Sequence, residues 1–134
     1  MSTLNRLIGH ILSVSETAPK DEMLGALERY LAGKRLVNVM KMAVSGREQP
    51  RPVNGFLPDL EGITLMIGRR VLGVAETCGS FTSEPALARI DALSRDGGTE
   101  LFVVVPGACY ATAKDYIEAK FPRREVTVVP YGKS

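Results

Sequence analysis

The first part of the chain repeats apolar positions with the spacing of an α-helix. The two apolar stripes consist of Leu4, Leu7, Ile8, Ile11 and Leu12, and then of Met23, Leu24, Leu27, Tyr30 and Leu31. Pro19 separates the two segments, and Gly33 is typical of the residue that follows a helix. The pattern predicts two amphipathic helices at the start of the chain.

After the second predicted helix, the pattern of side chains changes to a period of two residues. Residues 36–44 alternate in a way that suits a strand with apolar residues on both faces, with Met40 and Met42 on the same face as Leu36 and Val44. Residues 45–54 contain two prolines and read as a polar loop. We expect a β-hairpin next, with strands at 60–67 and 70–77 and a turn at Gly68-Arg69.

The second half of the chain alternates between helical and strand patterns. Ser83 is a good N-cap for a helix, with Leu87, Ile90 and Leu93 on its buried face. A strand at 101–105, a helix at 110–121 and a strand at 126–129 follow. This order predicts an α/β fold, a three-layer sandwich around a mixed sheet, with helix, strand, hairpin, helix, strand, helix and strand in sequence.

The 134 residues are enough for one hydrophobic core, so we expect one domain, 1–134, with an N-terminal helix in 1–18 and an α/β core in 19–134. The N-terminal helix has a narrow apolar stripe. It could cap the sheet or pair with its copy, and we favour pairing in a homodimer.

Composition narrows the classes of function. The chain has no apolar run long enough to span a membrane and no secretory signal pattern, so we predict a cytoplasmic protein without a membrane partner. One histidine, His10, leaves little imidazole for zinc or for a catalytic pair. The two cysteines, Cys78 and Cys109, are expected to be reduced and packed. A net charge of +2 permits nucleic-acid binding without arguing for it.

Two acids lie at the ends of the predicted hairpin, Asp59 before its first strand and Glu76 near the end of its second. A two-residue turn at Gly68-Arg69 places Asp59 opposite Cys78. The same pairing places Glu61 opposite Glu76, so all these residues share one face. A turn one residue earlier places Asp59 directly across from Glu76, whereas a three-residue turn separates them. Two acids on one face of a hairpin can share a divalent metal.

This layout resembles the PD-(D/E)-x-K nuclease superfamily, in which Pro-Asp opens one strand and an acid-x-Lys triplet lies on the next. Here Pro58-Asp59 supplies the first element and Glu76-Thr77-Cys78 the second, with cysteine in place of lysine. The resemblance covers about residues 20 to 130. It implies a restriction-endonuclease-like core and Mg²⁺- or Mn²⁺-dependent hydrolysis of nucleic acid, with DNA favoured over RNA.

The same resemblance implies roles for particular residues. Asp59 and Glu76 would be metal ligands and catalytic residues, with Glu28, on the helix before the first strand, as a further ligand. Lys41 on the preceding strand would replace the missing lysine, and Glu61 is a second acidic candidate through its strand parity.

Several alternatives remain open. The chain could be a catalytically degenerate member that serves as a nucleic-acid-binding or assembly module. It could also be a small α/β thiol enzyme built on Cys109, at a strand-to-helix junction where a helix N-terminus can lower a thiol pKa. A ligand-binding protein that admits a phosphate near Gly107 is a third class.

Overall fold

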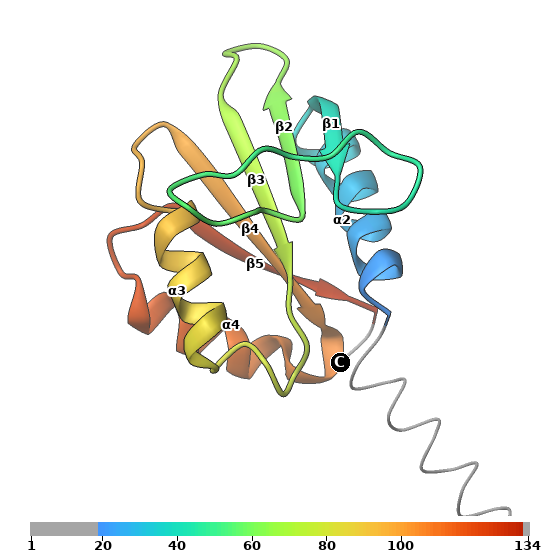
Figure 1. The fold of residues 1–134 in the computed structure, drawn as a ribbon. Coiled ribbons are helices and arrows are strands. Elements are labelled where there is room, and N and C mark those ends of the chain that lie inside the picture. The colour runs from blue at the N-terminus through green and yellow to red at the C-terminus, as the bar shows by residue number, and fades with distance from the viewer. Residues whose placement is uncertain (1–18, 133–134) are drawn as a thin grey trace, which may run out of the picture.

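The middle strands of the sheet consist of long apolar runs, and such strands need cover on both faces. Helices lie on both faces of the sheet and provide this cover (Figure 1). The computed structural model describes residues 19–132. In chain order the elements are α2 (Lys20–Lys34), β1 (Val37–Met42), β2 (Leu60–Thr64), β3 (Arg70–Ala75), α3 (Glu84–Leu93), β4 (Thr99–Pro106), the 3-10 turn η1 (Gly107–Cys109), α4 (Tyr110–Lys120) and β5 (Val126–Tyr131). The segment 1–18, with His10 and the expected N-terminal helix, lies outside the described residues.

The five strands lie in the order β1-β2-β3-β4-β5, so each strand neighbours the next one in the chain. Strands β1, β2 and β3 are antiparallel, while β3, β4 and β5 are parallel and are joined through α3 and α4. The predicted α/β class, the mixed sheet and the element order from residue 20 onward are confirmed. Among residues 19–132, no helix is both long and apolar enough to cross a membrane.

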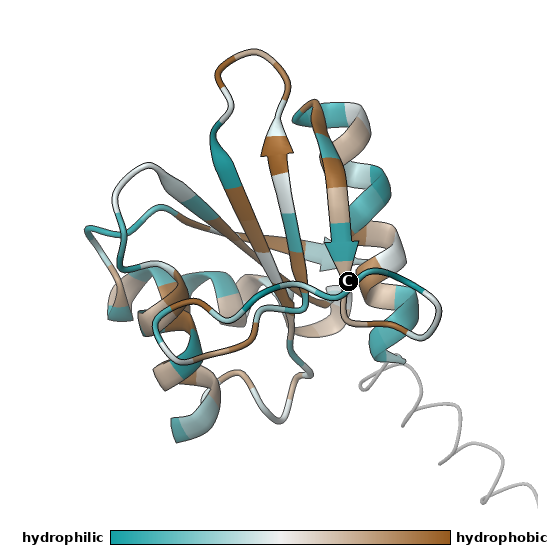
Figure 2. Ribbon diagram, turned by 45° about the horizontal axis from the view of Figure 1, so that its top comes forward, coloured by the Kyte–Doolittle hydropathy of each residue, from teal (hydrophilic) through white to brown (hydrophobic). Residues whose placement is uncertain are grey.

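Each face of the sheet has its own hydrophobic cluster. On one face α2 packs Leu24, Leu27 and Leu31 against the sheet, including Val71 and Phe102. On the other face α3 and α4 pack on the side chains of opposite strand parity, which are Leu72, Val74, Leu101, Val103, Val105 and Val128. Figure 2 shows the hydrophobic stretches of the central strands enclosed by these helices. The central strands are apolar on both faces because helices cover both faces of the sheet.

Strand β1 departs from the predicted alternation. Its pairing with β2 shifts by one residue between Asn38 and Lys41, and Val39 lies there with a positive φ of 50°. The extra residue is a β-bulge. As a result Val37 and Met42 both enter the α2-side cluster, although their parity predicted opposite faces. The expected strand with two apolar faces is wrong for β1, because the bulge reverses the direction of the side chains partway along it.

The hairpin turn lies earlier than predicted. It spans residues 65–68, closed by a hydrogen bond from the Thr64 N-H to the Arg69 carbonyl. Gly68 takes a φ of 63°, which glycine adopts at little cost. Leu60 then pairs with Gly73. A turn of four residues keeps the parity of the predicted two-residue turn, so side chains expected on one face still share it.

Helix α2 approaches β3 closely at one point. A Cβ atom added at Gly73 would lie 2.7 Å from the Leu27 Cδ2 atom and 3.2 Å from the Leu60 Cβ atom. Glycine here lets the helix lie directly on the sheet. The start of α2, and with it Lys20, is thereby held near the carboxyl ends of β3 and β4.

Candidate functional site: a buried pair of carboxylates at the sheet edge

Asp59 and Glu76 lie together at the carboxyl ends of β3 and β4. Asp59 immediately precedes β2, and its N-H donates to the Gly73 carbonyl of β3 at 2.9 Å. Glu76 immediately follows β3, and its N-H donates to the Val104 carbonyl of β4 at 3.0 Å. The two residues are only 3% and 9% exposed. In open α/β sheets this edge is the usual place for ligands.

One guanidinium bridges the two acids. Nη2 of Arg89, from α3, is 3.0 Å from Asp59 Oδ2 and 3.2 Å from Glu76 Oε2. The two carboxylates therefore lie no farther apart than the sum of these two short contacts. Because one nitrogen already contacts both, the two carboxylates face a single position between them.

Other donors also contact the carboxylates of Asp59 and Glu76. Lys20 Nζ, from the first residue of α2, is 2.7 Å from Asp59 Oδ1, and the Ala75 N-H donates to Asp59 Oδ2 at 2.9 Å. The Ser80 hydroxyl donates to Glu76 Oε1 at 2.8 Å. Burying charge is costly unless each charged atom is paired and hydrogen-bonded. Helices from opposite faces of the sheet, α2 and α3, each supply one cation that offsets this cost.

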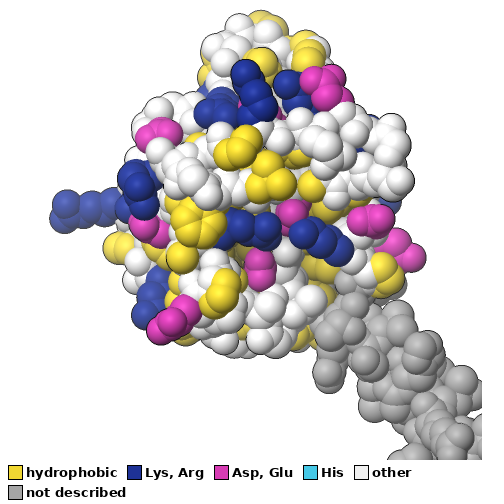
Figure 3. Space-filling model, in the orientation of Figure 1, with side chains coloured by type: hydrophobic (Ala, Val, Ile, Leu, Met, Phe, Trp, Pro, Cys, Tyr) yellow, Lys and Arg dark blue, Asp and Glu magenta, His cyan; other side chains and the backbone are white. Residues whose placement is uncertain are grey.

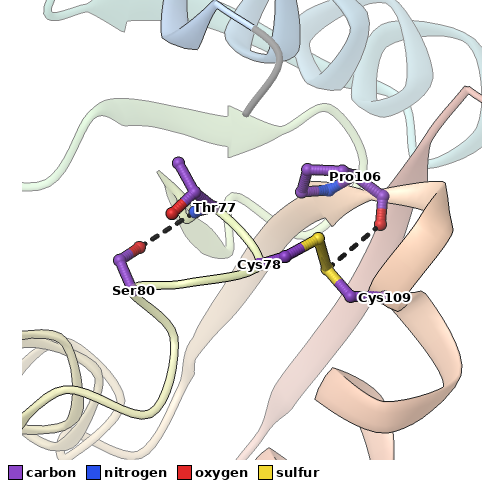
Figure 4. The surroundings of a disulfide bond; sticks show 5 residues. All are labelled: Thr77, Cys78, Ser80, Pro106 and Cys109. Carbon is purple, nitrogen blue, oxygen red and sulfur yellow. Dashed lines mark hydrogen bonds between the residues drawn. A yellow bond between two sulfur atoms is a disulfide. The ribbon is translucent and has the colours of Figure 1, made fainter. Parts of the chain in front are cut away.

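A hydrogen bond to Ser80 and a disulfide hold the loop that follows β3 (Figure 4). The Thr77 N-H donates to the Ser80 hydroxyl oxygen at 2.9 Å. Cys78, between them, is bonded to Cys109 at the end of η1, with a Cα–Cα separation of 5.7 Å. The expectation that both cysteines are reduced and packed is wrong. The parallel pairing of β3 with β4 brings their carboxyl ends together, so two cysteines 31 residues apart meet.

A small cleft opens beside the acidic pair. It measures about 210 Å³ and is lined by Pro19, Lys20, Met23, Ala75, Glu76, Thr77 and Ser80. Figure 3 shows basic side chains across the middle of this face of the molecule, with acidic side chains next to them. Lys20 is half exposed, whereas Asp59 is almost fully covered. A ligand in the cleft would therefore meet an ammonium and one edge of the Glu76 carboxylate first.

The structure places the other predicted site residues in separate ion pairs. Glu28 accepts from Arg47 at 2.8 Å, a hydrogen bond that raises the pKa of Arg47. Lys41 lies 3.2 Å from Glu48. Within residues 19–132, neither Glu28 nor Lys41 has a hydrogen bond or ion pair with Asp59 or Glu76.

Glu61 shares the strand face of Asp59 but belongs to a second cluster. Its carboxylate is 3.3 Å from Arg70 and 3.8 Å from Arg51, and it also accepts the Arg51 N-H at 3.2 Å. One residue, Leu60, separates it from Asp59 along the chain. Glu61 therefore lies on the face that strand parity predicted, but it pairs with Arg51 and Arg70 and not with the cations that contact Asp59.

Sequence reasoning missed Lys20, Ser80 and Arg89. Lys20 carries a weak signal, because a cation in the first turn of a helix opposes the helix dipole and acidic residues are preferred there. Arg89 lies next to Ile90 on α3 and carries no comparable signal. Its role depends on where α3 crosses the sheet edge, which local spacing does not determine.

The donor set suits a hard divalent cation only in part. Mg²⁺ is commonly held by one or two carboxylates with water and substrate oxygens completing the shell, and Asp59 and Glu76 supply two. Within residues 19–132 no cluster of three His, Cys, Asp or Glu side chains forms a metal site. The position between the two carboxylates is filled by Arg89. A cation shared by both acids would have to displace this guanidinium.

Comparisons of the chain with protein-family models, curated proteins and solved structures gave no match.

Proposed function

We propose that this chain is a nuclease-like domain with a restriction-endonuclease-like core that acts on nucleic acid through Asp59 and Glu76. The observation that carries the proposal is the convergence of these two buried carboxylates on one nitrogen at the carboxyl edge of the sheet. The element order and the mixed sheet support the same core. Cleavage of phosphodiester bonds fits this arrangement, because carboxylates at such an edge can hold Mg²⁺ or Mn²⁺.

When bound, Mg²⁺ or Mn²⁺ would polarise a phosphate oxygen and lower the pKa of an attacking water. Asp59 and Glu76 would hold the ion. Arg89 has an exposed fraction of 20%, so its guanidinium has a path to solvent when it leaves the pair. Once displaced, it can contact a phosphate oxygen, which suits its planar array of donors.

Lys20 is the lysine that this proposal uses, in place of Lys41. Its ammonium is 2.7 Å from Asp59 and lines the cleft beside Glu76. There it would orient a phosphate or a water and offset negative charge that develops during hydrolysis. Lys41 of β1 is partly buried and pairs with Glu48, away from the two acids.

A degenerate module that binds nucleic acid without cleaving it is the second candidate. Two cations, Arg89 and Lys20, already balance the charges of the two carboxylates, Asp59 and Glu76. This balance favours a module that needs no metal ion at the acidic pair. The usual motif lysine is also replaced by Cys78, which is in a disulfide. In this version the ion-pair network fixes the sheet edge, and binding comes from basic side chains on the surface.

DNA rather than RNA, a cytoplasmic location and a homodimer complete the proposal. The mild positive charge of the chain is compatible with a polyanion. These parts are independent of the acidic pair and are tested by substrate competition, by fractionation of cells and by sedimentation of the full chain.

The test of function compares cleavage and binding across three acid variants. Asp59→Asn and Glu76→Gln should abolish Mg²⁺- or Mn²⁺-dependent cleavage of single- and double-stranded DNA, whereas the matched control Glu61→Gln should retain it. Calorimetric titration with Mn²⁺ should show binding that both site variants lose. Salt-sensitive DNA binding that survives in all variants without cleavage would support the degenerate module. Absence of both cleavage and DNA binding would exclude both candidates.

A further inference from the structure

The Cys78–Cys109 disulfide joins the loop that holds Glu76 to a different part of the fold. Cys78 lies two residues after Glu76, and Cys109 lies at the junction between β4 and α4. Inside this loop Ser80 donates to Glu76, and the Ser80 N-H donates to the Thr77 carbonyl at 3.2 Å. The bond therefore fixes the loop that supplies the hydrogen bond to one carboxylate of the pair.

We propose that Cys78 and Cys109 form a reversible redox modification site whose oxidised state holds the Glu76 loop in place for cation binding. The part concerning cation binding rests on the proposed function, and the part concerning loop opening does not. Reduction by a dithiol such as a thioredoxin-class protein would release the loop and loosen Glu76.

The exposure of the two cysteines supports reversibility. Both are partly exposed, unlike the fully covered residues of the two cores. Cys109 also packs against the cluster on the α3–α4 face, so each residue is partly open to solvent and partly covered. Such partial exposure is what a dithiol needs to approach a disulfide in the folded protein. In the cytoplasmic location proposed above, a disulfide is more often transient or redox-sensing than structural, because thioredoxin and glutathione keep thiols reduced. This support, unlike the exposure of the cysteines, rests on the proposed location.

The exchange reaction balances with the dithiol as reductant. One thiolate of the dithiol attacks Cys78 Sγ, the bond between the two protein sulfurs breaks, and Cys109 leaves as a thiolate that takes up a proton. The second thiolate of the dithiol then attacks the mixed disulfide and releases Cys78, so the dithiol is oxidised and two protein thiols form. Cys109 suits the leaving role because it is the N-cap of α4, where the positive end of the helix dipole favours a thiolate leaving group.

The surroundings also accommodate the reduced form. Cys109 Sγ lies 3.5 Å from the Pro106 carbonyl oxygen (Figure 4). In the disulfide this sulfur carries no hydrogen, and after reduction the thiol can donate to that oxygen. The β4–α4 junction therefore has a polar partner ready for the free Cys109, whereas the Thr77–Ser80 turn loses its covalent anchor at Cys78.

The first experiment measures the bond and the loop in the full chain without metal. Alkylation followed by mass spectrometry should label neither cysteine before reduction and both after treatment of the folded protein with dithiothreitol. Hydrogen exchange should then accelerate in residues 77–83 while amides of β4 remain protected. Labelling without reductant, resistance of the folded protein to reduction, or unchanged exchange in 77–83 would each overturn the proposal.

The second experiment measures cation binding in the oxidised and reduced protein. Reduction should weaken Mn²⁺ binding by about tenfold or more, the usual effect of losing a group that orients a metal ligand. Ser80→Ala should produce a similar loss with the disulfide intact, and the Cys78→Ser and Cys109→Ser variants should match the reduced wild type. If oxidised protein binds no Mn²⁺ while the loop still opens on reduction, the proposed function fails and the redox site stands. Equal Mn²⁺ affinity in both redox states would reject the effect on cation binding.

Discussion

At one end of the β2–β3 hairpin two carboxylates are buried, and at the other end three aliphatic side chains are exposed. Asp59 and Glu76 are covered at the carboxyl end of β3. Leu65, Met66 and Ile67 form the turn and are 58%, 85% and 77% exposed. In Figure 1 this turn projects beyond the neighbouring strands. Both ends reverse the usual placement of polar and apolar residues.

The two reversals have different physical origins. Buried carboxylates are stable only with partners, and the fold supplies Arg89, Lys20, Ser80 and a backbone N-H. Exposed aliphatic residues need no partner, because their cost is only the contact with water. The acidic end is thus fixed by side-chain contacts from both helical layers, whereas the side chains of Leu65, Met66 and Ile67 at the tip stay exposed. The following changes should separate the two ends, beginning with the largest effect.

Replacing Arg89 should have the largest effect on stability. Arg89→Met leaves Asp59 and Glu76 with Lys20 as their remaining cation, and removing one partner of a buried pair costs about 3–5 kcal/mol. Urea unfolding at pH 7 measures the loss. Arg95→Met, just after the end of α3, is the matched control, since its pair with Asp91 is exposed. If both variants lost the same free energy of unfolding, the contacts of Arg89 with Asp59 and Glu76 would contribute no more than an exposed ion pair.

Filling the close contact beneath the acidic end should have an intermediate effect. In Gly73→Ala the new methyl meets Leu27 and Leu60, and overpacking of this kind costs about 1–3 kcal/mol. Gly97→Ala is the control, because a Cβ there meets nothing within 4 Å. Unfolding midpoints that fall equally for both variants would contradict the close packing of α2 on β3.

The exposed ion pair between Asp91 of α3 and Arg95 supplies a smaller reference effect that depends on pH. A hydrogen bond from Arg95, aided by Arg124, holds the pKa of Asp91 below its usual value, although partial burial opposes this. Because the folded pKa is the lower one, the stabilisation is present above the unfolded pKa and is lost as pH falls through the folded pKa. Asp91→Asn should cost less than about 1 kcal/mol at pH 7 and nothing at strongly acidic pH. Urea unfolding at both pH values measures this difference.

Polar substitution at the hairpin tip should have the smallest effect. Met66→Ser with Ile67→Ser should change the free energy of unfolding by no more than about 0.5 kcal/mol, as is usual for exposed positions. Leu60→Ala, at a fully buried position of the same hairpin, should cost about 2–5 kcal/mol. A large loss at the tip would show that its aliphatic residues are covered in solution.

Prediction from sequence succeeded where structure is locally encoded. Ser83 caps α3 as expected, with its hydroxyl oxygen accepting the Ala86 N-H at 3.3 Å. Helix α4 and strand β4 lie within one or two residues of their predicted bounds. Asp59 and Glu76 share a face because strand parity survives the change from a two-residue to a four-residue turn. These outcomes depend on periodicity and capping alone.

Prediction failed where contacts are long-range. The bulge in β1 adds one residue to its pairing with β2 and places Val37 and Met42 in one cluster. The disulfide depends on the parallel pairing of β3 with β4. Such features arise from the packing of distant segments, so spacing within one segment does not show them.

By itself the sequence determined the α/β class and the order of helices and strands from residue 20 onward, because these follow from side-chain periodicity. The shared face of Asp59 and Glu76 required, in addition, a turn with an even number of residues. The tertiary structure decided what surrounds that pair. It brought Lys20 from α2 and Arg89 from α3 to the same sheet edge, and it joined Cys78 to Cys109. Two buried negative charges require compensation, and only the packing of both helical layers on the sheet places the cations that provide it.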